Sequence, residues 1–263
     1  MNVVVCVKQV PEVAEAELKV EKDGRDIDRE DLVMDINEWD KYAVEEAVRI
    51  KETTGGKVTV VTLGDEDSED VLRRALAMGA EEAVLIDKED FEGSDAPGIV
   101  RGLHAAVKDL PFDLLLTGAQ SSDNGWGQIG ILLAEALALP YASLAVGIEL
   151  EDNQAVVLRE LEANTQEKVE LPLPGVITVQ TGINVPRYVS IMGIRKVRKI
   201  EIQETDAEDL GLSDEQIGEA ASSIASMTLK TPPLGGGAEI LEGSLNEICE
   251  KAARIIRDKG GLG

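Results

Sequence analysis

The chain has 263 residues, a hydrophobic content of 43% and an aromatic content of 3%. This length suits one large domain, or one domain with an extension, and Val, Leu, Ile and Ala must fill its core. The formal net charge of −25 disfavours nucleic acid and anionic membrane surfaces as partners. No apolar stretch approaches the length of a membrane span, and the amino terminus lacks the pattern of a signal peptide. Cys6 and Cys249 form no CxxC motif, so we expect a cytoplasmic protein without membrane insertion.

Short apolar runs alternate with helical patterns through the first half of the chain. The predicted strands cover residues 3–7, 58–63, 83–86 and 114–117. The predicted helices cover residues 42–50, 65–78, 99–107 and 129–137. Strands that alternate with helices of this length indicate βαβ units. The predicted fold class is therefore α/β, with an open, mainly parallel sheet and helices on both faces.

The pattern changes in the second half of the chain. Residues 143–150 and 155–161 flank the turn Glu151-Asp152-Asn153, which predicts an antiparallel β-hairpin. Residues 169–171 and 176–180 continue the β character, and a surface loop is expected to follow them.

The end of the chain has the composition of an arm and not of a second core. It is acidic, then rich in small residues, and it contains Pro232-Pro233 and Gly235-Gly236-Gly237. Residues 245–256 then regain helical spacing. We expect a ligand-binding α/β domain at residues 1–200 and an extended C-terminal arm at residues 201–263 that docks on another protein.

The predicted strand ends differ in charge. In open parallel sheets, ligands bind beyond the carboxyl ends of the strands. These ends lie at Cys6-Val7-Lys8, Leu63-Gly64-Asp65 and Thr117-Gly118. Carboxylates between Asp65 and Asp70 follow the second end and would repel a phosphate, whereas the loop 118–130 carries only one charged residue, Asp123. An anionic ligand is therefore expected at the loop, where backbone N–H groups and a helix start favour anions.

The loop 118–130 lacks the familiar motifs of nucleotide and hydrolase sites, including GxGxxG, GxxxxGK[ST] and GxSxG. It also carries no acid–base pair, so we predict a holding site without catalytic residues, and a purely structural turn is the alternative. His104 is the sole histidine and has no nearby His or Cys, so no metal site is predicted. Trp39 and Trp126 lie beside turn residues, where packing and ligand stacking are both open interpretations.

A basic run, Arg195-Lys196-Val197-Arg198-Lys199, stands out in this acidic chain. A solvated turn is one interpretation. Together with Arg187, the run is alternatively a docking surface for an acidic partner.

Five segments carry motifs of one known family. They are Cys6-Val7-Lys8-Gln9-Val10-Pro11, Asn37-Glu38-Trp39-Asp40, Ala75-Leu76-Ala77-Met78-Gly79-Ala80, the loop 118–130, and Thr181-Gly182-Ile183-Asn184-Val185-Pro186-Arg187-Tyr188. Over nearly its whole length the chain resembles the β (small) subunit of electron transfer flavoproteins. The likeness is strongest to the branch that works with trimethylamine-dehydrogenase-type partners.

The resemblance implies an adenine-nucleotide-binding, Rossmann-like fold and an electron carrier subunit, not an enzyme. Such a β subunit forms a heterodimer with a larger α subunit. One FAD lies mainly in the α subunit and shuttles electrons from a flavin-dependent dehydrogenase, such as acyl-CoA or trimethylamine dehydrogenase, to a downstream acceptor. The β subunit binds AMP as a structural ligand.

The resemblance also implies site residues by position. The implied AMP contacts are Cys6, Asn37, Glu38, Trp39, Asp40, Leu63, Gly118, Ala119, Gln120, Ser121, Ser122, Asp123, Asn124, Gly125, Trp126, Gly127, Gln128 and Ile129. The implied recognition loop for the dehydrogenase covers residues 182–199, with contacts from Arg187, Tyr188, Ile191, Met192 and Arg195. Ile191 occupies the position of an apolar anchor that inserts into the dehydrogenase.

Two departures from the AMP-binding pattern define an alternative. Ala119 stands where the family often has Lys or Arg, so one possible phosphate partner is missing. Val7-Lys8-Gln9-Val10-Pro11 resembles the electron-bifurcating branch, in which a second FAD replaces AMP and NADH is oxidised. AMP is favoured because the loop 118–130 and the segment 37–40 resemble the AMP branch at more positions. A free-standing adenine-nucleotide sensor of the universal-stress type is a third hypothesis, but the spacing of its phosphate loop is not met.

Overall fold

A computed structural model describes residues 1–13, 16, 18–224, 228–233 and 237–260. The strands are β1 (Val3–Cys6), β2 (Gln9–Pro11), β3 (Met34–Ile36), β4 (Val58–Gly64), β5 (Glu82–Asp87), β6 (Leu114–Gly118), β7 (Tyr141–Glu151), β8 (Gln154–Glu160), β9 (Gln166–Pro172), β10 (Gly175–Val179) and β11 (Gln203–Thr205). The helices are α1 (Glu38–Thr54), α2 (Glu69–Met78), α3 (Ala96–Val107), α4 (Ile129–Ala136), α5 (Ile191–Val197), α6 (Gly218–Ala221) and α7 (Leu245–Asp258). Short 3₁₀ turns cover Glu66–Ser68, Glu89–Phe91 and Glu162–Asn164.

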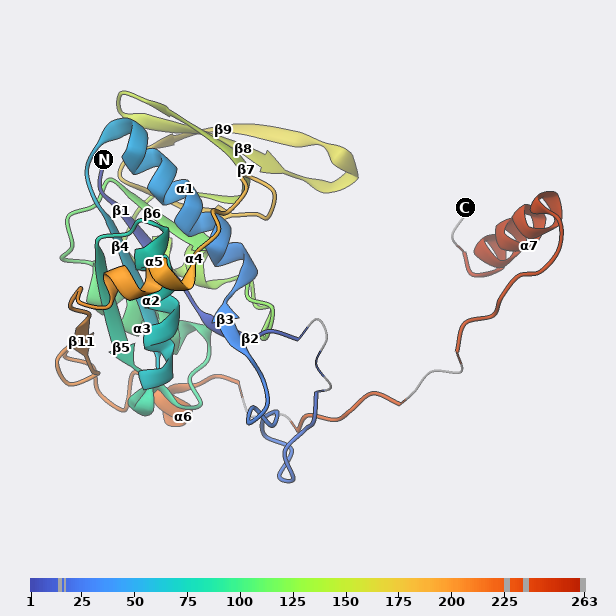
Figure 1. Ribbon diagram of the computed structural model, residues 1–263, viewed down its shortest axis with the longest axis horizontal. Helices are drawn as coiled ribbons and strands as arrows, with labels where there is room; N and C mark the ends of the chain where they lie inside the picture. The colour runs from blue at the N-terminus through green and yellow to red at the C-terminus, as the bar shows by residue number, and fades with distance from the viewer. Residues whose placement is uncertain (14–15, 17, 225–227, 234–236, 261–263) are drawn as a thin grey trace.

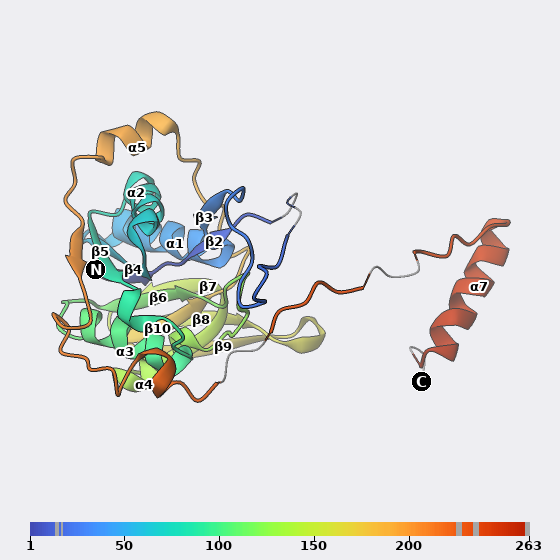
Figure 2. The same cartoon turned by 90° about the horizontal axis from the view of Figure 1, so that it is seen from below.

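One large sheet of nine strands, in the order β11-β5-β4-β1-β6-β10-β7-β8-β9, forms the centre of the molecule. Its strands from β11 to β7 pair in parallel, and β8 and β9 add an antiparallel edge. Helices α1 and α2 cover one face and α3 and α4 cover the other (Figures 1 and 2). The predicted open, mainly parallel α/β sheet with helices on both faces is confirmed.

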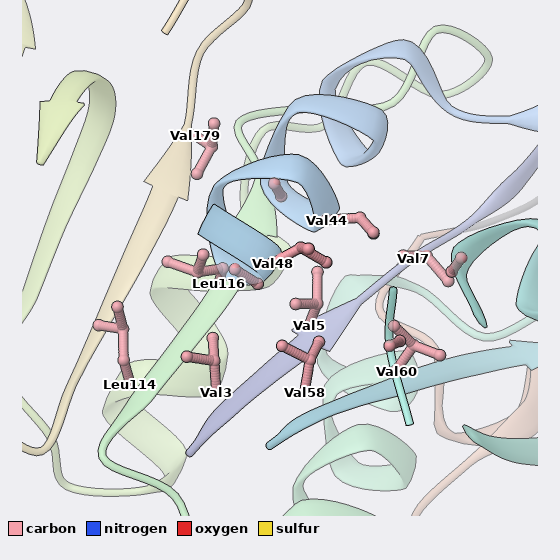
Figure 3. Close-up of a cluster of buried hydrophobic side chains, with 14 of the residues drawn as sticks. Val3, Val5, Val7, Val44, Val48, Val58, Val60, Leu114, Leu116 and Val179 are labelled. Carbon is pink, nitrogen blue, oxygen red and sulfur yellow. The ribbon is translucent and has the colours of Figure 1, made fainter. Parts of the chain in front are cut away.

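Two apolar clusters pack against the two faces of the sheet. Alternate residues of β1 divide between them, because successive side chains of a strand point to opposite faces. Val3 and Val5 pack with α1 and α2, whereas Val4 and Cys6 pack with α3 and α4. Figure 3 shows the first cluster, in which Val44 and Val48 of α1 lie over valines and leucines of the central strands. The fully buried β1 shows why its sequence is an unbroken apolar run.

The chain changes direction across the sheet between β1 and β6. From β1 it proceeds through β4 to β5 in one direction, and from β6 it continues on the other side of β1. At such a topological switch point, the connections after the two strands separate to opposite faces and leave a crevice. The carboxyl ends of β1 and β6 therefore mark the place where this fold forms a ligand site.

The predicted hairpin is confirmed and is longer than expected. Strand β7 pairs with β8 from Ala145 to Glu151, and β9 extends the ribbon as a third antiparallel strand. Strand β10 then returns to the parallel sheet between β6 and β7. The ribbon therefore continues the main sheet and is not a separate layer (Figure 1).

The predicted arm, residues 201–263, begins as part of the α/β body. Strand β11 pairs with β5 at the edge of the sheet, and Ala207 and Ile217 are buried in the core. Farther along, the N–H of Leu229 donates to the carbonyl of Gly24 at 2.8 Å. The division at residue 200 stays a prediction, and two residues of the predicted glycine run, 235 and 236, lie outside the described residues.

Helix α7 lies away from the body at the end of an extended segment (Figures 1 and 2). A capping box begins it, in which Ser244 and Glu247 bond to each other's backbone. Its apolar residues include Leu245, Ile255 and Ile256, all exposed. An amphipathic helix of this kind gains most of its stability from packing, so its apolar face suits a surface on another protein.

Candidate functional site

A cavity of about 210 Å³ opens at the switch point of the sheet. It lies between the ends of β1 and β6, the loop from β6 to α4, and helix α3. Its lining residues are Cys6, Val7, Lys8, Asn37, Asp40, Leu63, Ser94, Ile99, Leu103, Thr117, Gly118, Ala119, Gln120, Ser121, Asn124, Trp126, Gly127, Gln128 and Ile129. The cavity thus brings together the three strand ends that the sequence singled out.

The buried carboxylate of Asp40 joins the two central strand ends. Its Oδ2 accepts the backbone N–H of Lys8 at 2.7 Å, and its Oδ1 accepts that of Gly118 at 3.0 Å. A Cβ at Gly118 would lie 2.2 Å from Oδ1, so a side chain there would displace the carboxylate. Asp40 therefore fixes the separation of β1 and β6 at the cavity, and Gly118 is needed for this close approach.

Asn37 attaches the following loop to the same strand end. Its backbone N–H donates to the carbonyl of Lys8 at 2.9 Å. Its side-chain Nδ2 donates to the carbonyl of Gln120 at 2.8 Å, and its Oδ1 accepts the N–H of Ser122 at 3.1 Å. Since both side-chain atoms are engaged by the loop, Asn37 supports the cavity wall in addition to lining it.

The loop ends at a helix start that favours anions. Gly125 and Gly127 have φ values of 62° and 61°, which glycine adopts without strain. No side chain caps α4 at Gln128. At Gly130 an added Cβ would lie 2.4 Å from Thr117 Oγ1, so α4 begins in close contact with β6. Because Gln128 and Ile129 line the cavity, the first turn of α4 presents backbone N–H groups beside it.

Lys8 supplies a positive charge at the cavity. Its Nζ lies 2.5 Å from Oδ2 of Asp123 in the loop. Burial tends to raise the pKa of Asp123, but the charge and hydrogen bond of Lys8 hold that pKa below its ordinary value. Lys8 was missing from the predicted contacts, although it directly follows the first predicted strand, at the same edge of the sheet as the loop.

The other walls of the cavity are apolar or neutral. Ile99 and Leu103 of α3 and Leu63 of β4 form an apolar side. Burial raises the pKa of Cys6 to about 12, and the charge of Asp40 adds to this effect, so the thiol is neutral and no nucleophile at ordinary pH. The cavity therefore combines an apolar wall with one polar, anion-compatible end.

Most predicted contacts line the cavity, and a few lie elsewhere. The predicted residues absent from its lining are Glu38, Trp39, Ser122, Asp123 and Gly125. Glu38 is exposed at the start of α1. The indole N–H of Trp39 donates to Oε1 of Gln180 at 2.6 Å, so that ring bonds to the segment after β10. Trp126 lines the cavity. Six lining residues are absent from the implied contacts, namely Val7, Lys8, Ser94, Ile99, Leu103 and Thr117, although Val7, Lys8 and Thr117 belong to the predicted strand ends.

The predicted recognition loop presents apolar side chains to solvent. Tyr188, Ile191 and Met192 are 91%, 71% and 60% exposed, and Arg195 is exposed as well. Arg187 differs from these residues, because its guanidinium bonds to Glu45 of α1 at 2.8 Å and to Glu52 at 2.9 Å. The loop residues thus divide into solvent-facing apolar groups and an arginine held against α1.

Within the described part of the chain, no cluster of His, Cys, Asp and Glu side chains is arranged to hold a metal ion. Among the same residues, no helix has both the length and the apolar character needed to cross a bilayer.

The parallel sheet, the cavity at its switch point and the anion-compatible loop define a Rossmann-like α/β protein with a ligand site. A family model described as electron transfer flavoprotein domain matches residues 26–210. The chain is 37% identical over 265 residues to the electron transfer flavoprotein subunit beta of Methylophilus methylotrophus, covering 99% of this chain and 100% of that one. It is also similar to subunit CarD of the caffeyl-CoA reductase-Etf complex of Acetobacterium woodii. The two are 34% identical over an alignment that covers 98% of this chain and 99% of the relative. The chain therefore belongs to the electron transfer flavoprotein family, as a β subunit.

The buried Asp40 makes stability depend on pH in a defined direction. Burial raises its pKa to about 7, against the opposing effect of the Lys8, Asn37 and Gly118 hydrogen bonds. Between about pH 4 and 7 the folded state therefore binds more protons than the unfolded state, and the free energy of unfolding falls as pH rises. We expect the stability advantage of the wild type over Asp40→Asn to shrink over this range, by up to about 4 kcal/mol.

Urea denaturation at a series of pH values measures this difference. Asp65→Asn is a suitable control, because Lys88 holds the pKa of Asp65 below its ordinary value against the effect of burial. The stability advantage of the wild type over Asp65→Asn is present above the ordinary pKa of an aspartate and is lost at lower pH. It therefore changes with pH in the opposite direction to the advantage over Asp40→Asn. A constant difference between wild type and Asp40→Asn from pH 4 to 8 would show that the carboxylate is not perturbed.

Proposed function

We propose that this chain is the β subunit of a heterodimeric electron carrier, and that the cavity at the carboxyl ends of β1 and β6 holds AMP as a structural ligand. One FAD, held mainly by an α subunit, supplies the electron chemistry when it is bound. Electrons pass through it from a flavin-dependent dehydrogenase, such as acyl-CoA or trimethylamine dehydrogenase, to a downstream acceptor. This subunit would bind AMP and dock on the α subunit and on the dehydrogenase. It would act in the cytoplasm without entering a membrane.

The observation that carries this proposal is the loop between β6 and α4. It lines the cavity with small, neutral residues and ends at a helix start without a side-chain cap. A phosphate at that end would meet backbone N–H groups of α4, and Lys8 would offset its charge. The apolar side, formed by Leu63, Ile99 and Leu103, suits a nucleobase. The residues present therefore fit an adenine nucleotide.

Lys8 offers an answer to the missing basic residue at position 119. Lys8 lines the cavity at the end of β1, and its Nζ lies 2.5 Å from Oδ2 of Asp123 in the loop. A phosphate that drew the ammonium group away from Asp123 would gain a basic partner from a different strand than the one that carries Ala119.

The alternative occupant is a second FAD, as in an electron-bifurcating β subunit that oxidises NADH. One observation favours it: the likeness extends to subunits named for caffeyl-CoA reductase-Etf and acryloyl-CoA reductase complexes, at 34% and 32% identity. To distinguish the two, the chain is purified with its α subunit and its nucleotides are extracted and quantified. AMP and FAD in equal amounts support the proposal. Two FAD and no AMP, with reduction by NADH, establish the alternative.

The C-terminal arm has a role in the same proposal. Its terminal helix α7 exposes Leu245, Ile255 and Ile256 and lies apart from the body in Figure 1. We assign this face to the α subunit, with residues 1–200 as the nucleotide-binding domain and residues 201–263 as the arm.

Ile191 is expected to anchor the dehydrogenase. It is 71% exposed at the start of α5, next to the exposed Met192 and the basic Arg195. Ile191→Ala should weaken docking by about tenfold, the effect of truncating a well-packed interface residue, and leave the heterodimer intact. Ile224→Ala is the control, because it removes an exposed apolar group next to Ser223, which bonds to Asp95 at the start of α3. Stopped-flow reduction of the flavin by the dehydrogenase measures the effect, and an unchanged rate with Ile191→Ala contradicts this assignment.

Lys8 is expected to contact the phosphate. Lys8→Met should weaken AMP binding by about tenfold or more, because a charge-assisted hydrogen bond is lost. The double variant Lys8→Met/Asp123→Asn separates contact from charge balance. If Lys8 contacts the phosphate, the double variant still binds weakly, whereas full recovery would mean that Lys8 only neutralises Asp123. Titration of the nucleotide-depleted heterodimer with AMP measures both, with Lys57→Met as a surface control.

A further inference from the structure

The polarity of the segment from Asn184 to Met192 is reversed relative to an ordinary surface loop. Its polar residues Asn184 and Arg187 face the body and bond to α1. Its apolar residues Val185, Tyr188 and Ile191 are 87%, 91% and 71% exposed, whereas Val189 packs against the core. Exposed apolar groups gain nothing from folding, so the fold must hold them out by other means.

The first of these means is a contact between Arg187 and α1. Its Nε and Nη2 donate to the two carboxylate oxygens of Glu45 at 2.8 and 3.0 Å, and its backbone N–H also donates to Glu45 at 3.0 Å. Its Nη1 donates to Glu52 at 2.9 Å. The side chain of Glu45 is only 6% exposed, so this two-pronged pair is shielded from water. Asn184 adds hydrogen bonds to Glu46 and to the carbonyl of Tyr42 at 2.9 and 3.0 Å.

The second means is a contact between Arg73 of α2 and the end of α5. Its Nη1 donates to the carbonyl of Val197 at 3.1 Å and to that of Ile200. Glu69, one helical turn away, fixes the same guanidinium at 2.8 Å. Helix α5 has seven residues, too few to be stable alone in water. Its position beside α2, visible in Figure 2, therefore depends on contacts such as these and on the partly buried Val197.

We propose that Arg187 and Arg73 are positioning residues, which hold the exposed apolar groups of the recognition loop in the conformation that docks the dehydrogenase. Both guanidinium groups point into the body, so they act through Tyr188, Ile191 and Met192 and not by contact with the partner. This inference rests on the proposed function for its consequence, and it changes the predicted role of Arg187 from partner contact to support.

Loss of these supports should lower the affinity for the dehydrogenase and leave the electron chemistry of the flavin unchanged. If the loop leaves its docking conformation, the apparent affinity falls in proportion to the population that remains. A variant whose loop is in place a tenth of the time therefore has an apparent KM for the dehydrogenase reaction about ten times higher, with kcat unchanged. Reduction of the flavin by dithionite, which needs no docking, should keep its wild-type rate.

The experiment compares the purified heterodimer with its Arg187→Lys and Glu45→Gln variants. The first keeps the charge and loses the two-pronged geometry, and the second keeps the shape and loses the charge. Lys57→Ala, which removes a surface ion pair with Glu82 near the start of β4, is the control. Hydrogen exchange by mass spectrometry follows residues 184–197, and steady-state assays with trimethylamine dehydrogenase and with an acyl-CoA dehydrogenase give KM and kcat.

We expect exchange in residues 184–197 to accelerate about tenfold in both variants while β1, β4 and β6 stay protected. We expect KM to rise and kcat to hold with the dehydrogenase that reduces the wild type. Unchanged exchange, or faster exchange with an unchanged KM, overturns the positioning role. If neither dehydrogenase reduces the wild type, the proposed partner class fails, and the exchange result still decides whether Arg187 fixes the loop.

Discussion

The carboxylate of Asp40 bonds to both central strand ends, and the geometry of the ligand cavity depends on it. It accepts the N–H of Lys8 after β1 and the N–H of Gly118 at the end of β6. These N–H groups lie where the sheet strands have ended and the ladder offers no partner, so an acceptor from α1 must satisfy them. Asn37, one turn earlier, then holds the loop that follows β6. Two residues at one helix start, Asn37 and Asp40, thus engage two strand ends and one loop at the cavity.

Helix α1 supports both functional regions of the molecule. Its first turn carries Asp40 at the cavity, and its later turns carry Glu45 and Glu46 beneath the recognition loop. These three acids are buried on one helix, and each accepts hydrogen bonds from another element. One helix thus supports both the cavity proposed to hold a nucleotide and the loop proposed to dock a partner.

Much of the fold and part of the site could be predicted from the sequence. The alternation of apolar runs with helical patterns gave the parallel sheet, because a buried strand such as β1 is apolar without interruption. The strand-end rule brought Cys6, Leu63 and Gly118 together, because parallel strands end at one edge. The contribution of Ile99 and Leu103 to the cavity could not be predicted, since it depends on how α3 packs across its face of the sheet. The sequence could not show whether the side chain of Arg187 faces solvent or α1, because residues in a loop follow no periodic pattern of burial. Strand β11 is too short, at three residues, to show any periodicity.

The central claim is that the cavity at the switch point holds one adenine nucleotide whose phosphate lies at the start of α4. An experimental structure of the purified heterodimer tests it most directly. We expect density for AMP beyond the carboxyl ends of β1 and β6, with its phosphate beside the N–H groups of the first turn of α4 and within reach of Lys8. Density for a flavin in this cavity, or a phosphate at the acidic end of β4 near Asp65, would contradict it.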